Sequence, residues 1–275
     1  MARTPPGPPP PPIVQRVRLR YAKRGRLRFT SHRDFARAFE RALRRAGVPM
    51  AYSAGFTPHP KISYVNATPT GVASEAEYLE IGLATHVELE TLRAAIDAAL
   101  PPGLDVVEAV AAGPGSLADR IEASSWRVEL PGVPVADAAA AVVAFLAESS
   151  VTVERLTKDG RREIDARAAV VSATVVPAAA AVEEVVVGAG DGSPDGPLAG
   201  GCGPVAVPRA ILELVVRQAT PAVRPDDVLA ALRAVAGLAL VAPPVAVRLA
   251  QGPLDSAGAV GDPLAVDRIS VGTTP

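Results

Sequence analysis

Residues 27–83 read LRFTSHRDFARAFERALRRAGVPMAYSAGFTPHPKISYVNATPTGVASEAEYLEIGL, and this stretch decides both the fold and the search for a site. It holds seven of the ten aromatic residues of the chain and two of its three histidines, His32 and His59. The rest of the chain is rich in Ala, Val, Leu, Pro and Gly, which can pack into a core but offer few reactive groups. We therefore expect any functional site to be built from this stretch.

The charge of the chain is distributed unevenly. Its 275 residues carry a net charge of −1, so no global field points to nucleic acid or to a membrane surface. Between Arg16 and Arg45, however, twelve Lys and Arg residues are accompanied by only two acids, Asp34 and Glu40. Such a local block of positive charge is more informative about binding partners than the net charge.

Cysteine content and hydropathy exclude several classes of protein. Cys202 is the only cysteine, which rules out a disulfide framework and a cysteine-ligated zinc or iron–sulfur centre. No apolar run approaches the ~20 residues that a membrane-spanning helix needs. The N-terminal sequence MARTPPGPPPPPI lacks the apolar segment of a signal peptide. We expect a cytoplasmic protein with no membrane contact and no cofactor.

The order of the predicted elements indicates the fold class. Residues 13–22 alternate apolar and basic side chains, which predicts a strand with one buried face and one basic face. Ser31 can cap a helix whose apolar face includes Phe35 and Leu43, and Gly47 can end it. Strands over 48–53, 62–66 and 77–83, a helix over 86–100 and a strand over 104–110 are predicted to follow. The order strand, helix, strand, strand, helix, strand is that of a ferredoxin-like sandwich.

A related pattern is found again after residue 124. We therefore predict an α+β protein made of two tandem ferredoxin-like (βαββαβ) units. Its parts are a disordered Pro-rich leader (1–13), a basic first domain (14–112), a second α+β domain (124–251) with a mobile insertion (177–208), and a disordered tail (252–275).

Arginines on the predicted helix favour binding of nucleic acid. Arg33, Arg37 and Arg41 recur every four residues, at a pitch of about 6 Å that is close to the phosphate spacing of a nucleic-acid strand. Aromatic side chains nearby could stack on bases. A solvated helix face would show the same charge pattern. The residues predicted to bind nucleic acid or another phosphate-bearing substrate are Arg28, Arg33, Arg37, Arg41, Arg44, Arg45, Tyr52, Phe56 and Lys61.

The two histidines of the stretch each admit two interpretations. His32 lies just inside the predicted helix start, where the helix dipole and nearby arginines disfavour its charged form, so it could be a neutral base or a capping residue. His59 lies between two prolines that fix its backbone, which suits a binding loop or a rigid turn equally. In an enzyme, His32 and His59 would be the general base and acid. Without a third ligand they predict no metal site.

The stretch also resembles the radical SAM-linked proteins, a bacterial family of unknown function. The resemblance lies in the Ser-His-x-Asp helix start, the Arg-Arg-Ala-Gly helix end, the Tyr-Ser-x-Gly-Phe-x-Pro-His-Pro-Lys loop and a Pro-x-Gly turn before Glu-Tyr. It covers residues 14–110. The matching residues are Ser31, His32, Asp34, Arg44, Arg45, Gly47, Tyr52, Ser53, Gly55, Phe56, Pro58, His59, Pro60, Lys61, Pro69, Gly71, Glu77 and Tyr78. Because the Cys-x-x-x-Cys-x-x-Cys motif of the enzymes is absent, the resemblance implies the stand-alone form.

Three functions remain open at the level of sequence. The first is an accessory protein that works with a radical SAM enzyme and binds RNA or another phosphate-bearing substrate on its basic face. The alternative is an RNA-processing or RNA-modifying enzyme that uses His32 and His59. The third is a scaffold whose Pro-rich ends dock other proteins. The expected partners are a radical SAM protein, implied by the resemblance, and RNA.

Overall fold

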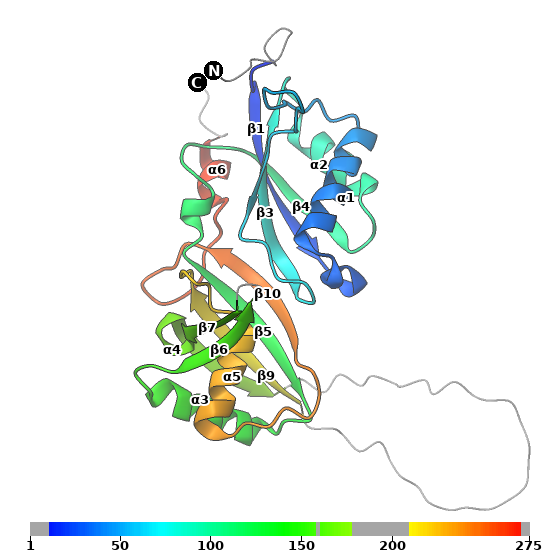
Figure 1. Ribbon diagram of the computed structural model, residues 1–275. Helices are drawn as coiled ribbons and strands as arrows, with labels where there is room; N and C mark the ends of the chain where they lie inside the picture. Colours follow the sequence, from blue (N-terminus) through cyan, green and yellow to red (C-terminus); the bar gives the residue numbers. More distant parts are fainter. Residues whose placement is uncertain (1–10, 158–159, 178–208, 271–275) are drawn as a thin grey trace, which may run out of the picture.

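The computed structural model describes residues 11–157, 160–177 and 209–270, which form a mixed α+β fold with six α-helices and a mostly antiparallel sheet (Figure 1). The first half contains β1 (Gln15–Lys23), the 3-10 helix η1 (Gly25–Phe29), α1 (His32–Arg45), β2 (Ile62–Val65), β3 (Ala73–Leu83), α2 (Leu89–Ala99) and β4 (Leu104–Ala111). A second 3-10 helix, η2 (Ala118–Arg120), leads into the second half. That half contains β5 (Ala123–Pro131), α3 (Val135–Ala147), β6 (Thr152–Thr157), β7 (Gly160–Asp165), α4 (Ala166–Ala169), β8 (Val170–Pro177), β9 (Arg209–Arg217), α5 (Pro225–Ala236), β10 (Val245–Gly252) and α6 (Ala265–Ser270).

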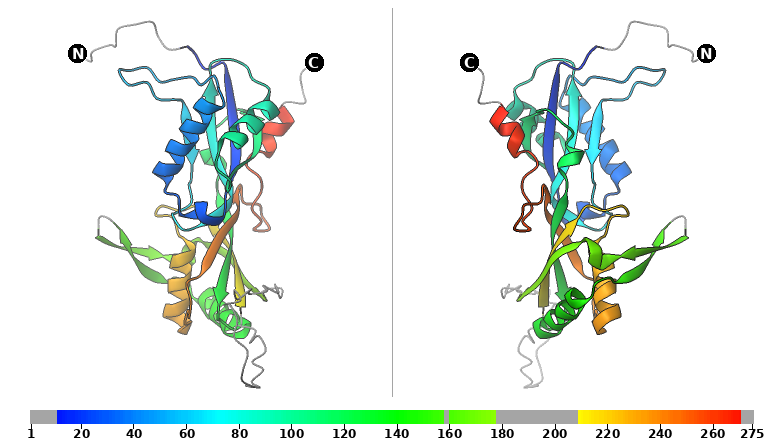
Figure 2. Two further views of the ribbon diagram at one scale, coloured as in Figure 1. Left: turned by 90° about the vertical axis from the view of Figure 1, so that its right-hand side faces the viewer. Right: turned by 90° about the vertical axis from the view of Figure 1, so that its left-hand side faces the viewer.

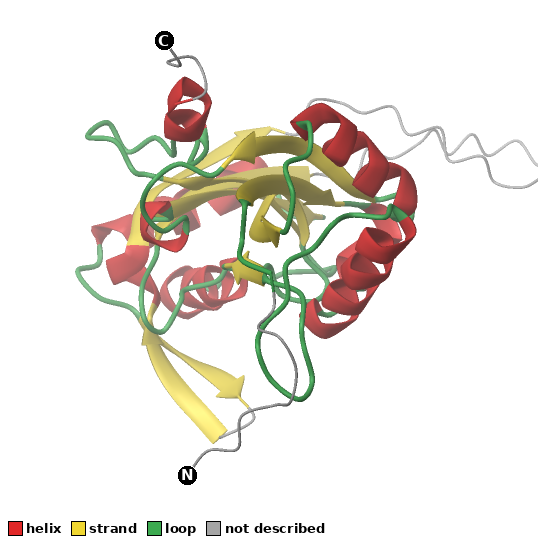
Figure 3. Ribbon diagram, turned by 90° about the horizontal axis from the view of Figure 1, so that it is seen from above, coloured by secondary structure: helices red, strands yellow, loops and turns green. Residues whose placement is uncertain are grey.

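One sheet runs through both halves. Its strand order is β4-β1-β3-β10-β5-β9-β8, with β2 paired to β3 beside that path. β10 joins the halves, because it pairs antiparallel with β5 and, at Val247 and Arg248, parallel with the start of β3. The strands β6 and β7 form a separate hairpin that projects from the body of the molecule (Figures 2 and 3).

The helix predicted between Ser31 and Gly47 is confirmed as α1. The Ser31 hydroxyl accepts a hydrogen bond from the Asp34 N–H at 3.2 Å, and Gly47 takes the left-handed conformation (φ 63°) that ends the helix. Phe35 and Phe39 are buried on the face that packs against the sheet. Together with α2, this face forms the core of the first half, while α3 and α5 cover the core of the second.

The prediction of an α+β fold is confirmed, but two separate tandem units are not. Each half repeats one strand order, β4-β1-β3-β2 in the first and β10-β5-β9-β8 in the second. The sheet is nevertheless continuous across the junction, because β3 and β10 pair directly. The assignment of both halves to the ferredoxin-like class therefore stays a prediction.

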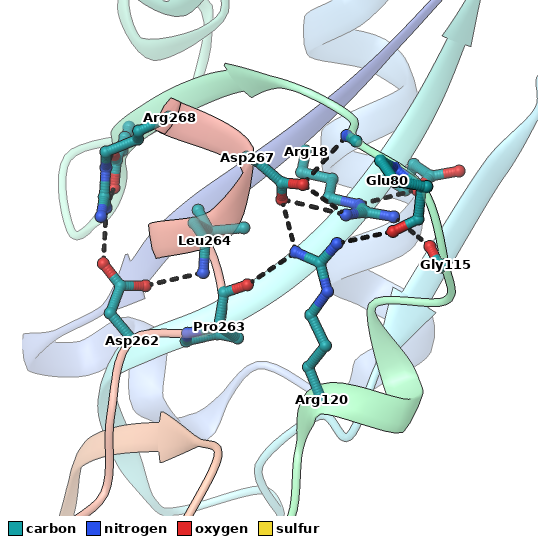
Figure 4. Close-up of polar contacts among 12 residues, drawn as sticks. Arg18, Glu80, Gly115, Arg120, Asp262, Pro263, Leu264, Asp267 and Arg268 are labelled. Atoms are coloured by element: carbon teal, nitrogen blue, oxygen red, sulfur yellow. Dashed lines mark hydrogen bonds and ion pairs between the residues drawn. The ribbon is translucent and has the colours of Figure 1, made fainter. Parts of the chain in front are cut away.

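The prediction of a disordered tail over 252–275 is wrong as far as residue 270. After β10 the chain returns to the first half, where α6 packs beside β4. Asp267 is fully buried there and accepts hydrogen bonds from Arg18 (2.8 and 2.9 Å), Arg120 (2.9 Å) and the Gly113 N–H (2.9 Å), as Figure 4 shows. The segment is ordered by long-range ion pairs, which its own composition does not reveal.

The remaining segments that were predicted to lack structure fall mainly outside the described residues. These are the leader up to residue 10, the insertion from 178 to 208 and the last five residues of the tail. From residue 11 the chain has no regular structure until β1, and the Val14 N–H already donates to the Leu83 carbonyl at 2.8 Å.

Candidate nucleic-acid interface

The outer face of α1 is lined with arginine. It lies opposite the buried Phe35 and Phe39, so none of its members takes part in the core. An open hollow of about 490 Å³ is formed by three of them near the end of the helix. The exposed arginines of this face, called the α1 arginine face below, are Arg33, Arg37, Arg41, Arg44 and Arg45.

Few acidic groups neutralise the α1 arginine face. Arg37 lies 4.0 Å from Asp34 across one helical turn, and both side chains are more than half exposed, so the pair contributes little. Arg45 donates to the backbone carbonyl of Ala99 at the end of α2. In the described parts of the chain, Arg33, Arg41 and Arg44 have no acidic partner. The positive charge of the face is therefore available to a ligand.

The residues at the start of α1 pack more closely than the helix face. The Arg28 guanidinium lies 4.8 Å from the centre of the Phe29 ring, and its buried Nε has no hydrogen-bond partner among the described residues. The His32 ring meets the Tyr64 ring edge-on, with 4.9 Å between their centres. Ser31, not His32, caps the helix. Burial, and to a lesser degree Glu40, raises the pKa of the Tyr64 hydroxyl above its usual range.

The predicted binding loop lies beyond the other end of α1. Instead of the strand predicted over 48–53, this segment makes isolated bridges, one of which joins Tyr52 to Pro60. The His59 N–H donates to the Ser53 hydroxyl at 3.0 Å, and the Ser53 N–H donates to the His59 carbonyl at 2.8 Å. Phe56 (68% exposed), Tyr52 (41% exposed) and Lys61 face solvent.

His32 is the first residue of α1, whereas His59 lies in the loop between α1 and β2. His32 contacts Tyr64, whereas His59 precedes residues that pair with the end of β3 at Gly82. Five residues of extended chain, about 16 Å, separate His59 from Tyr64. No hydrogen bond or ring contact joins the two histidines within the described residues. Their predicted roles as base and acid stay a prediction that this arrangement does not favour.

Two arginines of the basic face predicted for the first strand form ion pairs within the molecule. Arg16 and Arg18 each form an ion pair of 3.0 Å with Glu80 of β3. Arg18 is almost fully buried, and its other end is held by Asp267. The positive charge of the basic face predicted for this strand is therefore partly neutralised, because the neighbouring strand and α6 supply carboxylates. The arginines of the α1 arginine face, by contrast, are all exposed.

A buried charged cluster between the halves was missed by sequence reasoning. Arg248 of β10 forms an ion pair with Glu77 of β3, and both side chains are 2% exposed. Glu77 also accepts from the Thr68 N–H at 3.0 Å. Burial lowers the pKa of nearby Lys23, while the Glu77 carboxylate acts in the opposite direction, and burial raises the pKa of Tyr21. Glu77 lies in the matched motif, but nothing in the sequence marks Arg248 as its partner.

The described residues contain neither a metal-ligating cluster nor a membrane-spanning helix. No group of three or more His, Cys, Asp or Glu side chains that could hold a metal ion is found within these residues. No helix in the same part of the chain is long and apolar enough to cross a membrane.

The chain belongs to a bacterial protein family. A family model described as "Uncharacterized protein conserved in bacteria (DUF2344)" matches residues 16–225, from the start of β1 to the start of α5. A search of curated proteins found no match. The matched region includes the α1 arginine face and Glu77 but ends before Arg248. Nothing in the match refers to radical SAM chemistry, so that link stays a prediction.

Proposed function

We propose that this protein binds RNA through the α1 arginine face and acts as an accessory protein rather than as an enzyme. The observation that carries the proposal is the exposure of five arginines on one helix, which make a single long contact to a carboxylate within the described residues. Arg33, Arg37 and Arg41 follow one another at about 6 Å along the axis, so they can contact consecutive phosphates of one strand.

Exposed aromatic rings near both ends of α1 support a single-stranded ligand. Phe29 (59% exposed) precedes the helix, and Tyr52 and Phe56 follow it in the loop. A positively charged track combined with aromatic rings is the arrangement by which proteins bind single-stranded nucleic acid without reading its sequence. We therefore expect strong dependence on salt and weak dependence on base sequence.

Charge reversal on α1 tests the proposal. The variant Arg33→Glu/Arg37→Glu/Arg41→Glu should stay folded, because all three side chains are exposed. Its affinity for a single-stranded RNA oligonucleotide, measured by fluorescence anisotropy, should fall below detection at physiological salt. For Arg→Gln changes at the same sites, the slope of log K against log salt should become shallower by about 0.7 per lost phosphate contact.

A matched control separates a local effect from a change in net charge. Arg161, Arg162 and Arg233 are exposed residues of the second half, and replacing all three with Glu changes the net charge by the same amount. This control should bind RNA with nearly the affinity of the unaltered protein. Equal losses in both variants, or unchanged binding by the α1 variant, would contradict the proposed interface.

The proposed radical SAM partner rests on the sequence resemblance alone. Affinity purification of the tagged protein from its native host, followed by mass spectrometry of protein and RNA, should recover a radical SAM enzyme. Incubating the purified chain with the recovered RNA tests the enzymatic alternative. RNA that is cleaved or modified by the protein alone, and spared by His32→Ala and His59→Ala, would replace the accessory role with a catalytic one.

A further inference from the structure

A small cavity at the junction of the two halves has a positively charged lining. It has a volume of about 150 Å³ and is lined from the first half by the turn after β2 and from the second by β5, β10 and the segment between β9 and α5. Three of its lining residues are arginines, and none is acidic. The lining residues used below are Asn66, Trp126, Arg217, Gln218, Arg224 and Arg248.

Arg248 is held in a fixed orientation at the wall of this cavity. Its Nη2 donates to the Glu77 carboxylate and, at 2.8 Å, to the Asn66 carbonyl. Its guanidinium lies 5.5 Å from the centre of the Trp126 ring. These contacts leave Nη1 without a partner within the described residues. A buried guanidinium fixed in this way loses little conformational entropy when it donates to a further acceptor.

The guanidinium groups of the other two arginines of the cavity form no ion pair within the described residues; the Arg224 backbone N–H donates to the Asp227 carboxylate at 2.6 Å. Arg217 ends β9 and Arg224 precedes α5, and both side chains are exposed. Since Glu77 compensates only Arg248, the charges of Arg217 and Arg224 remain uncompensated at the cavity. The lining therefore favours an anion on electrostatic grounds.

Amide groups complete the wall. Asn66 is the only non-glycine residue with a positive φ (44°) in the described residues, and this conformation directs its carbonyl to Arg248. Its side-chain amide donates to Gln218 at 3.2 Å and to Gln251 at 3.1 Å. Asn tolerates the left-handed region better than most residues, so this backbone conformation of Asn66 causes little strain.

We propose that this cavity is a binding site for a phosphate group, either inorganic phosphate or the phosphate of a small monoester. Guanidinium groups match the oxygens of phosphate with paired hydrogen bonds, and three of them line this cavity. The volume lies below the roughly 300–1,000 Å³ of pockets that enclose whole small molecules, so the cavity admits the phosphate and leaves an ester group outside. The site is separate from the α1 arginine face and does not depend on it.

The protein contains its own reporter for this site. Trp126 is the only tryptophan of the chain and lines the cavity. Titration of the full chain with sodium phosphate, at constant ionic strength maintained with sodium chloride, should produce a saturable change in tryptophan fluorescence. AMP should give a dissociation constant within about threefold of that for phosphate, because both present the same group to the cavity. Isothermal titration calorimetry of the unaltered protein should give the same dissociation constant as the fluorescence titration.

Neutral substitutions locate the binding. Arg217→Gln and Arg224→Gln should each weaken phosphate binding about tenfold, the effect of losing one charge-assisted hydrogen bond. Arg233→Gln should change the dissociation constant for phosphate less than twofold. Arg233 lies on α5, which begins directly after Arg224, but it does not line the cavity. The α1 triple variant should bind phosphate normally, which keeps this test independent of RNA binding.

Two results would overturn the proposal. One is the absence of saturable phosphate binding in both fluorescence and calorimetry with the unaltered protein. The other is that Arg217→Gln and Arg224→Gln bind AMP and phosphate as tightly as the unaltered protein and have the same melting temperature. The ligand would then bind elsewhere.

Discussion

Asp267 shows how much one side chain can contribute to the stability of this fold. Its carboxylate is fully buried and receives donors from Arg18, Arg120 and the Gly113 backbone. Arg18 is also nearly fully buried, and without Asp267 its guanidinium would keep only the ion pair with Glu80. Removing one partner of such a pair is far more destabilising than the net contribution of the pair, because the remaining charge is left in a poorly solvating environment.

Replacing Asp267 with Asn should therefore lower the free energy of unfolding by about 3–5 kcal/mol. Chemical denaturation followed by circular dichroism measures this change. Asp119 is exposed and serves as the control, since Asp119→Asn should alter stability by less than about 0.5 kcal/mol. A loss for Asp267→Asn as small as that of the control would contradict a stabilising role of the Asp267 carboxylate.

The same carboxylate sets an expected pH dependence. Burial alone would raise the pKa of Asp267, but hydrogen bonds from Arg120, Arg18 and the Gly113 N–H outweigh it and hold the pKa below its usual range. A lowered pKa in the folded state means that the stabilisation is complete well above the unfolded-state pKa of about 3.9 and is lost as the pH falls through the folded-state pKa. The stability difference between the unaltered protein and Asp267→Asn should stay constant from about pH 5 to 8 and shrink below about pH 4. A difference that already shrinks between pH 7 and 5 would contradict a lowered pKa.

At the level of elements, α1 is the helix whose limits the sequence indicates most directly. Ser31 both receives the Asp34 N–H and donates to its carboxylate at 2.6 Å, so the first turn is closed by local contacts. Ser31→Ala should destabilise the protein by about 1 kcal/mol, seen as a lower melting temperature. Ser149→Ala, in an exposed connection, should leave the melting temperature unchanged. An equal effect of both changes would argue against capping by Ser31.

Predictions from sequence succeeded where the determining contacts are local. The spacing of Phe35 and Phe39 and the position of Gly47 lie within α1 itself, so they could be recognised without knowing the fold. The partners of Arg18 and Arg248 could not be recognised without the fold. Asp267 is 249 positions from Arg18, and Glu77 is 171 positions from Arg248. Which charges meet depends on the strand order, so the carboxylates that pair with the basic first strand could not be identified, because they come from distant segments.

For the whole molecule, the continuous sheet predicts cooperative unfolding. All four tyrosines lie in the first half and the only tryptophan lies in the second, so the two halves have separate optical signals. Because β10 pairs with both β3 and β5, tyrosine absorbance and tryptophan fluorescence should report the same urea midpoint. Two distinct midpoints would instead indicate halves that fold independently, as the tandem-unit prediction implies.

The contact between α6 and β1 also affects the order of folding during protein synthesis. Because 249 residues separate Asp267 from Arg18, the ribosome must work for roughly 12–50 s after making Arg18 before its acidic partner exists. Throughout that interval, of the two carboxylates that pair with the Arg18 guanidinium, only that of Glu80 has been synthesised. The first strand to be translated thus reaches its final environment only when the last described helix has been translated.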